Sequence, residues 1–174
     1  MRKGNNVLVL VFVILVLFSK SAISGEMLPV EKEEFRDSFL EKLLGNWKIT
    51  LKIGAEVSEN SMEADWLLNH KFLRLHMKDK AVPGQYEALV FVGFDNNKGK
   101  YVAHWLDTFG GTFSAVGYGE KRENQIEFKF EYPDQPFFNT FSYEEKSGRW
   151  TFTGEQGQKD GKRKLFAIDT LEKQ

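Results

Sequence analysis

The 174-residue sequence contains no cysteine and only three histidines. Without cysteine the chain forms no disulfide, has no thiolate nucleophile or ligand, and offers no sulfur for lipid attachment. The histidines, His70, His76 and His104, do not show a zinc-type spacing with carboxylates. Six residues of extended strand separate His70 from His76, about 20 Å, so these two cannot share a metal ion. The sequence therefore predicts no metal and no cofactor.

Motifs of several other chemistries are also missing. The chain has no recognisable Ser-His-Asp set and no paired catalytic carboxylates. Its glycine pairs at 110–111 and 117–119 lie in a predicted turn and strand, not before a helix, which argues against phosphate binding. Basic and acidic residues alternate without a basic stripe, so we expect no nucleic-acid partner. No catalytic residue is predicted from motifs, and whether the protein is an enzyme stays open.

The N-terminus has the three parts of a secretory signal peptide. Arg2 and Lys3 precede twelve apolar residues, 7–18, and small residues follow up to Ser24. A membrane-spanning helix needs about 18–20 apolar residues, so we predict a cleaved signal peptide over 1–24 and no membrane span in the mature form. Its removal takes three of the 24 basic residues and leaves 25 acidic ones, a net charge near −4. The expected location is periplasmic or secreted.

Residues 25–45 form a predicted N-terminal segment that contains the one convincing helix, over 31–44. Phe35, Phe39 and Leu43 recur every four residues, and Gly45 is a typical stop signal. This helix has one apolar face to bury. We expect it either to cover the back of a central hairpin or to close one end of a barrel.

The central hairpin spans residues 86–108, with its turn at 96–99. A four-residue loop pairs Val90 with Trp105 and Ala88 with Asp107 on one face, and Phe91 with His104 on the other. Both faces are largely apolar, which is typical of a strand pair covered on both sides. We predict that the Val90–Trp105–Asp107 face points inward, because a charged Asp107 is easier to place at an open mouth. The Phe91–His104 face would then lie under the helix.

The remaining mature chain alternates apolar and polar residues in short runs. One hairpin turns on Asn69-His70 and sets Asp65 opposite Arg74; another pairs Tyr143 with Trp150. About ten strands at 8–12-residue spacing, with no helix between them, indicate an antiparallel barrel or sandwich. Because consecutive hairpins lack a long crossover, we predict an all-β, up-and-down antiparallel barrel of about ten strands over residues 46–171. Such a barrel holds packed side chains or one small ligand.

An ordered set of motifs resembles a known group. The motifs are Gly45-x-Trp47, Trp66–Leu73, Gly93-Phe-Asp95, Lys100-Tyr101 and Trp105-Leu-Asp107. Together they resemble a bacterial lipocalin-like group known as domain of unknown function 1579, over nearly all of residues 43–171. Where that group usually has Gly-Gly, this chain has Asn69-His70, two residue types that tolerate positive φ. The resemblance implies a calycin-type barrel, without an activity.

The resemblance also implies details of the barrel floor and of cofactors. In lipocalins the Trp of Gly-x-Trp plugs the floor under a basic residue of the last strand, which here would be Arg163 or Lys164. Some small lipocalin-like barrels bind haem through a late histidine, but this chain has none after His104. Haem is therefore not predicted.

Three functions remain open at this point. The leading hypothesis is an exported barrel that binds a small apolar or amphipathic molecule. The expected ligand-binding residues are Trp66, Val90, Tyr101, His104, Trp105, Asp107, Tyr143 and Trp150. The second hypothesis is a small enzyme that uses the same pocket, with His104 or Asp107 as acid or base. The third is a filled barrel that acts through a protein interface; the oligomeric state is not predicted.

Overall fold

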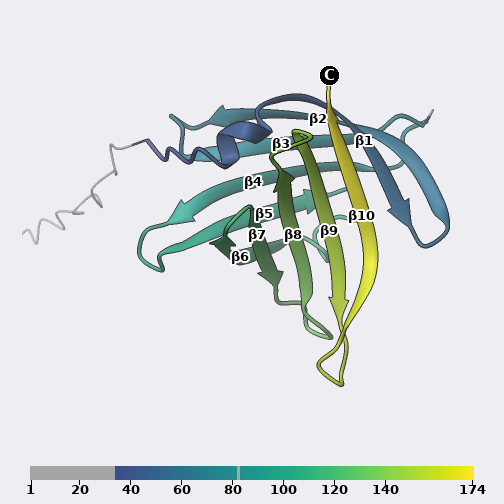
Figure 1. Ribbon diagram of the computed structural model, residues 1–174. Coiled ribbons are helices and arrows are strands. Elements are labelled where there is room, and N and C mark those ends of the chain that lie inside the picture. The colour runs from purple at the N-terminus through teal and green to yellow at the C-terminus, as the bar shows by residue number, and fades with distance from the viewer. Residues whose placement is uncertain (1–33, 82) are drawn as a thin grey trace, which may run out of the picture. The chain divides into compact units, whose positions relative to one another are not determined.

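The computed structural model describes residues 34–81 and 83–174 (Figure 1). Ten antiparallel strands close into a barrel in which β1 pairs with β10 and every other pair is consecutive along the chain. The strands are β1 (Gly45–Ile53), β2 (Glu56–Leu67), β3 (Phe72–Asp79), β4 (Glu87–Asp95), β5 (Lys100–Asp107), β6 (Ala115–Arg122), β7 (Gln125–Phe130), β8 (Phe137–Glu144), β9 (Arg149–Gly157) and β10 (Arg163–Lys173). The predicted all-β, up-and-down barrel of about ten strands is confirmed. The predicted signal peptide, 1–24, lies outside the described residues.

The two-residue period of the strands separates an inner from an outer face. In β1 the side chains of Trp47 and Ile49 are buried inside, whereas Lys48 between them is less buried and faces outward. Aromatic rings fill much of the interior, with Phe141 stacked 4.0 Å from Phe152 between ring centroids. This burial of apolar area is the main contribution to the stability of the closed sheet.

The predicted hairpin registers are those of the structure. Val90 lies opposite Trp105 and Asp65 opposite Arg74, whose Nε donates to the Asp65 carboxylate at 2.7 Å. The Asn69-His70 turn keeps its register because Leu68, Asn69 and His70 adopt φ values of 51°, 55° and 62°. The alternation predicts Leu68 on the interior face, but Leu68 lies in this turn and is exposed.

The structure confirms which face of the central hairpin points inward, but not what covers its other face. Val90, Val92 and Ala103 are buried in the interior, and Trp105 and Asp107 continue the same face of β5. The other face, with Phe91 and His104, lies on the outside of the barrel and is partly exposed. The prediction that a helix covers this outer face is wrong for the residues that the structure describes.

The predicted helix over 31–44 does not form in its described part, 34–44. Only one turn of 3₁₀ helix is present, Leu40–Leu43, and the residues before Ser38 have no regular helix. The Asp37 carboxylate holds this turn by accepting from the backbone N–H groups of Phe39 and Leu40, at 2.8 and 2.9 Å. Apolar periodicity correctly marked the buried side chains but not the backbone that carries them. Residues 31–33 lie outside the described part of the chain.

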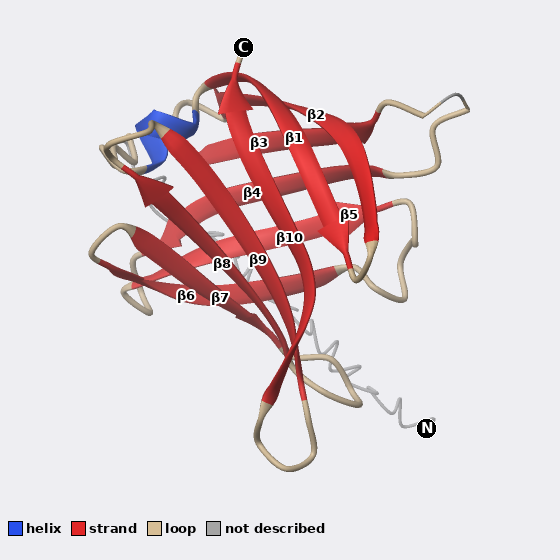
Figure 2. Ribbon diagram, turned by 45° about the vertical axis from the view of Figure 1, so that its right-hand side comes forward, coloured by secondary structure: helices blue, strands red, loops and turns tan. Residues whose placement is uncertain are grey.

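The segment 34–44 instead closes one end of the barrel, the second of the two arrangements expected for it. The indole N–H groups of Trp47 and Trp150 donate to the carbonyls of Leu43 and Lys42, at 2.6 and 3.3 Å. Phe39 packs against Trp150 with 4.7 Å between ring centroids. We call this the capped end; the blue helix in Figure 2 marks it.

The capped end also corrects the expected floor contact. Lys173 Nζ, not Arg163 or Lys164, lies over Trp47, 5.5 Å from the ring centroid. Because β10 runs antiparallel to β1, its last residues meet the start of β1, where Trp47 pairs with Lys173. Arg163 lies at the other end of β10, where it binds Glu127.

The opposite end of the barrel, called here the far end, contains the β1–β2, β3–β4, β5–β6, β7–β8 and β9–β10 connections.

No helix of the described residues is long and apolar enough to cross a membrane.

Candidate functional site

A hollow of about 370 Å³ lies at the far end, beside the β1–β2 hairpin. It is lined by Leu51, Ile53, Glu56, Val57 and Ser58. Leu51 pairs with Ser58, and Ile53 with Glu56, in continuation of the inner face that begins with Trp47. The walls of the hollow thus combine apolar side chains with one carboxylate and one hydroxyl.

Polar side chains gather on the inner face next to this hollow. We call Asn60, Asp79, Tyr86, Asp107 and Asp169 the far-end cluster. Asp169 lies opposite Leu51, Asn60 opposite Asp79, and Asp107 opposite Ala88. Tyr86 extends the inner face of β4, because its carbonyl accepts from the Asp79 N–H at 3.0 Å. Polar groups inside a barrel are costly unless they are paired.

Two acceptors of the far-end cluster lack a donor. Asn60 is only 3% exposed, and its Oδ1 has no hydrogen-bond partner among the described residues. Asp79 Oδ1, on the neighbouring strand, is buried and equally unpartnered within the described part of the chain. The second oxygen, Asp79 Oδ2, accepts from the backbone N–H groups of Gln85 and Tyr86 at 2.7 and 2.8 Å. The Asp79 carboxylate is therefore held in place with one oxygen unused.

Burial perturbs the ionisable groups of the far-end cluster. It raises the pKa of Asp169 to about 7, since no cation or hydrogen-bond donor of the described residues offsets the loss of solvent. Burial, and secondarily the Asp107 charge, raise the pKa of the Tyr86 phenol. Both Asp169 and Tyr86 thus favour their neutral forms more than they would in water.

Aromatic side chains surround the same end. Trp105 Nε1 donates to Asp107 at 3.2 Å, and the Tyr132 hydroxyl donates to the Phe113 carbonyl at 2.8 Å. Phe109 and Phe113, in the β5–β6 connection, are 67% and 54% exposed. Small-molecule sites are commonly lined by apolar and aromatic side chains with a few polar groups.

The predicted site residues divide between three places. Val90, Trp105 and Asp107 face the interior as predicted, and the last two join the far end. Trp66, Tyr101, Tyr143 and Trp150 instead contact the capping segment or lie beside it. The Tyr101 hydroxyl donates to Asp37, Trp66 Nε1 donates to Glu41 at 3.1 Å, and Tyr143 lies 5.0 Å from Trp150 between ring centroids.

His104 does not share a site with the others. Its ring lies on the outer face, 6.0 Å from the Phe72 ring. His104 and Asp107 therefore point to opposite sides of β5 and cannot act together in one interior pocket. The other histidines are also outside: His76 Nε2 lies 2.6 Å from Glu87 Oε1, and His70 stacks on Trp66.

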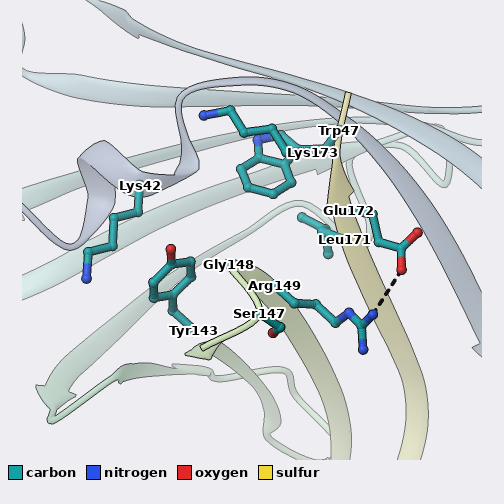
Figure 3. Close-up of a pocket in the computed structure, with 9 residues that line it drawn as sticks. All are labelled: Lys42, Trp47, Tyr143, Ser147, Gly148, Arg149, Leu171, Glu172 and Lys173. Atoms are coloured by element: carbon teal, nitrogen blue, oxygen red, sulfur yellow. Dashed lines mark hydrogen bonds and ion pairs between the residues drawn. The ribbon is translucent and has the colours of Figure 1, made fainter. Parts of the chain in front are cut away.

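A larger groove, of about 610 Å³, lies at the capped end (Figure 3). Its lining is Lys42, Trp47, Tyr143, Ser147, Gly148, Arg149, Leu171, Glu172 and Lys173. The cations here already have partners. Arg149 bonds Glu172 at 3.1 Å, Lys42 pairs with Glu145, and Lys173 lies over Trp47. The groove therefore offers fewer unsatisfied groups to a ligand than the far end.

Sequence reasoning missed Asn60, Asp79 and Asp169. Each occupies an inner-face position in a strand, two residues from Met62, Met77 and Leu171 respectively. A polar residue in the apolar half of an alternating strand was the available signal. No group of three or more histidine, aspartate or glutamate side chains in the described part of the chain is placed to hold a metal ion.

Comparisons with known proteins place the chain in a family. Residues 34–166 match the family model described as protein of unknown function, DUF1579. The crystal structure of Rv2717c from M. tuberculosis aligns with a TM-score of 0.52 at 11% identity, over 80% of this chain and 99% of that one. A redesigned β-barrel aligns at 13% identity with a TM-score of 0.35, over 78% of this chain and 94% of that one. No curated protein matches the sequence. Since the family model covers most of the chain, this protein belongs to the DUF1579 family.

Proposed function

We propose that the barrel binds a small amphipathic molecule at its far end. The observation that carries the proposal is that a hollow of mixed apolar and polar lining adjoins, along the inner face, a polar cluster that is buried or partly buried: Leu51 lines the hollow and lies opposite Asp169. Apolar walls supply affinity, and a few polar groups orient the ligand.

Two further features support the proposal that the ligand binds at the far end. Phe109 and Phe113 expose aromatic surface at the entrance, where an apolar tail would first make contact. The resemblance to lipocalins, suggested by the Trp47–Lys173 contact at the capped end, favours entry from the opposite end.

We also propose that the protein acts after export, in the periplasm or outside the cell, as the signal-peptide pattern indicates. Intact mass of the exported protein tests this: a chain that begins at Gly25 is expected. A retained N-terminus in the exported fraction would contradict it.

The binding proposal is tested with two matched substitutions. Ser58→Trp fills the far-end hollow, and Ser147→Trp fills the groove at the capped end. Each variant and the parent are purified from the native host and examined by native mass spectrometry. A small-molecule adduct on the parent and on Ser147→Trp, but not on Ser58→Trp, is expected. The reverse pattern would assign binding to the groove, and no adduct on any sample would count against the proposal.

A further inference from the structure

The proposed binding site leaves one chemical question, the nature of the polar group that it recognises. Asn60 and Asp79 lie directly opposite each other on β2 and β3 and share the inner face. Each presents one oxygen without a donor among the described residues, and Asn60 is 3% exposed. A buried acceptor left unpaired destabilises the folded protein, and a bound hydrogen-bond donor would remove that cost.

Acidic side chains outnumber basic ones on the inner face at this end. Asp79, Asp107 and Asp169 face the interior there, and Glu56 lines the hollow. Two interior-facing basic residues of the described strands lie at the capped end, where Lys121 contacts Asp37 and Lys173 contacts Trp47. A third, Lys164, is exposed at the far-end start of β10, five residues before Asp169. A cation is therefore favoured over an anion at the far end.

The carboxylates do not converge as metal ligands do. The described residues hold no set of three acidic or histidine side chains placed for one ion. An ammonium group suits the arrangement better, because it carries up to three donors on a single nitrogen and needs only neighbouring acceptors. Trp105 and Tyr86 are partly buried against the core at this end, and aromatic rings attract organic cations.

We propose that the far end recognises an organic amine: Asn60 Oδ1 and Asp79 Oδ1 accept hydrogen bonds from a cationic nitrogen, and the apolar part of the molecule lies against Leu51 and Ile53. This inference rests on the proposed function, since it names the ligand class of the same site. The hollow of about 370 Å³, whose lining includes Leu51 and Ile53, would take the apolar part, and Asn60 lies on the same face of β2 as Ser58 in that lining.

The test compares three ligands that share one alkyl chain. Octylamine, octan-1-ol and octanoate are titrated into the purified protein at about pH 7.5, where the amine is charged, by calorimetry. Octylamine is expected to bind at equimolar stoichiometry and at least about tenfold more tightly than the alcohol, with octanoate weakest. Equal affinity for all three, or a preference for octanoate, would overturn the amine assignment and leave the proposed function standing. Binding of none would count against both.

Two variants test whether Asn60 and Asp79 of the far-end cluster cause the preference for octylamine over octan-1-ol. Asn60→Leu removes one acceptor, and Asp79→Asn removes a charge while offering an amide donor to Asn60. Each should lower octylamine affinity at least about tenfold and change octan-1-ol affinity less than about twofold. Asp65→Asn, on the outer face beside Arg74, is the control and should bind octylamine like the parent. Equal losses for amine and alcohol in both variants, or loss in the control, would overturn the proposal.

Discussion

At the scale of single residues, the notable feature is a set of polar side chains placed where packing favours apolar ones. Asn60 follows the inner-face alternation of Met62 and Ala64, yet its Oδ1 finds no donor among the described residues. Asp169 stands two residues before the fully buried Leu171 on the same face of β10. Such side chains lower the free energy of unfolding unless a hydrogen-bond partner satisfies their polar atoms.

Asn60→Leu should therefore stabilise the protein. The substitution replaces an amide whose Oδ1 has no donor among the described residues with an apolar side chain of the same branched shape, and we expect the free energy of unfolding to rise by roughly 1–2 kcal/mol. Urea denaturation without ligand measures this. A loss of stability would show that Asn60 has a partner in the folded protein, and Asn46→Leu, at an exposed position of β1, provides a reference.

Asp169 should make stability depend on pH. Its pKa is raised to about 7 in the folded state, above the ordinary value of 3.8, so the folded protein binds the proton more tightly than the unfolded chain. Stability should then fall as pH rises from about 4 to about 7, and level off above. Asp169→Asn should remove this fall and stabilise the protein at about pH 8 by roughly 1–3 kcal/mol.

Denaturation curves of the parent and of Asp169→Asn, recorded at about pH 5 and at about pH 8, test this dependence. Most of the expected fall in the free energy of unfolding lies between these two pH values. A variant that is no more stable than the parent at the higher pH would contradict it. Asp160→Asn is a suitable control, because Asp160 is an exposed turn residue paired with Lys162.

At the scale of elements, the sequence predicted strands far better than the helix. Cross-strand registers such as Val90–Trp105 follow from alternation and turn length alone, which are local properties. The segment 34–44 was mispredicted because its backbone is set by distant partners. Phe35 N–H donates to the His70 carbonyl at 3.1 Å, and the Phe35 ring lies 5.7 Å from that of Phe94. These contacts draw the chain across the end of the barrel and leave room for one 3₁₀ turn.

Asp37 is the residue that fastens this segment. Its carboxylate accepts from two backbone N–H groups and from the Tyr101 hydroxyl, and it faces Lys121 Nζ at 3.7 Å. Asp37→Ala should lower the free energy of unfolding by roughly 2–4 kcal/mol, since it removes a cap and a charge-assisted hydrogen bond.

Thermal or urea denaturation measures the effect. Glu34→Ala is the matched control, because Glu34 pairs with the exposed Arg36 at the surface and should change stability by less than about 0.5 kcal/mol. Equal effects of the two substitutions would refute the role assigned to Asp37.

At the scale of the whole molecule, the barrel has two chemically different ends. The capped end is closed by Phe39 and Trp150, and the charges around its groove are paired. The far end combines a hollow with exposed aromatic rings and with acceptors that have no donor among the described residues. Sequence reasoning placed Trp105 and Asp107 on the inner face, but it did not separate the two ends. That separation depends on the closure of β1 against β10, which no local pattern encodes.

Backbone amide NMR of the isotope-labelled protein, titrated with octylamine, tests the central claim most directly. Binding at the far end should produce the largest shift changes at Asn60, Asp79 and Asp107, with little change at Ser147 or Lys173. Changes concentrated at Ser147 and Lys173, or no changes at saturating ligand, would contradict the claim that the far end is the binding site.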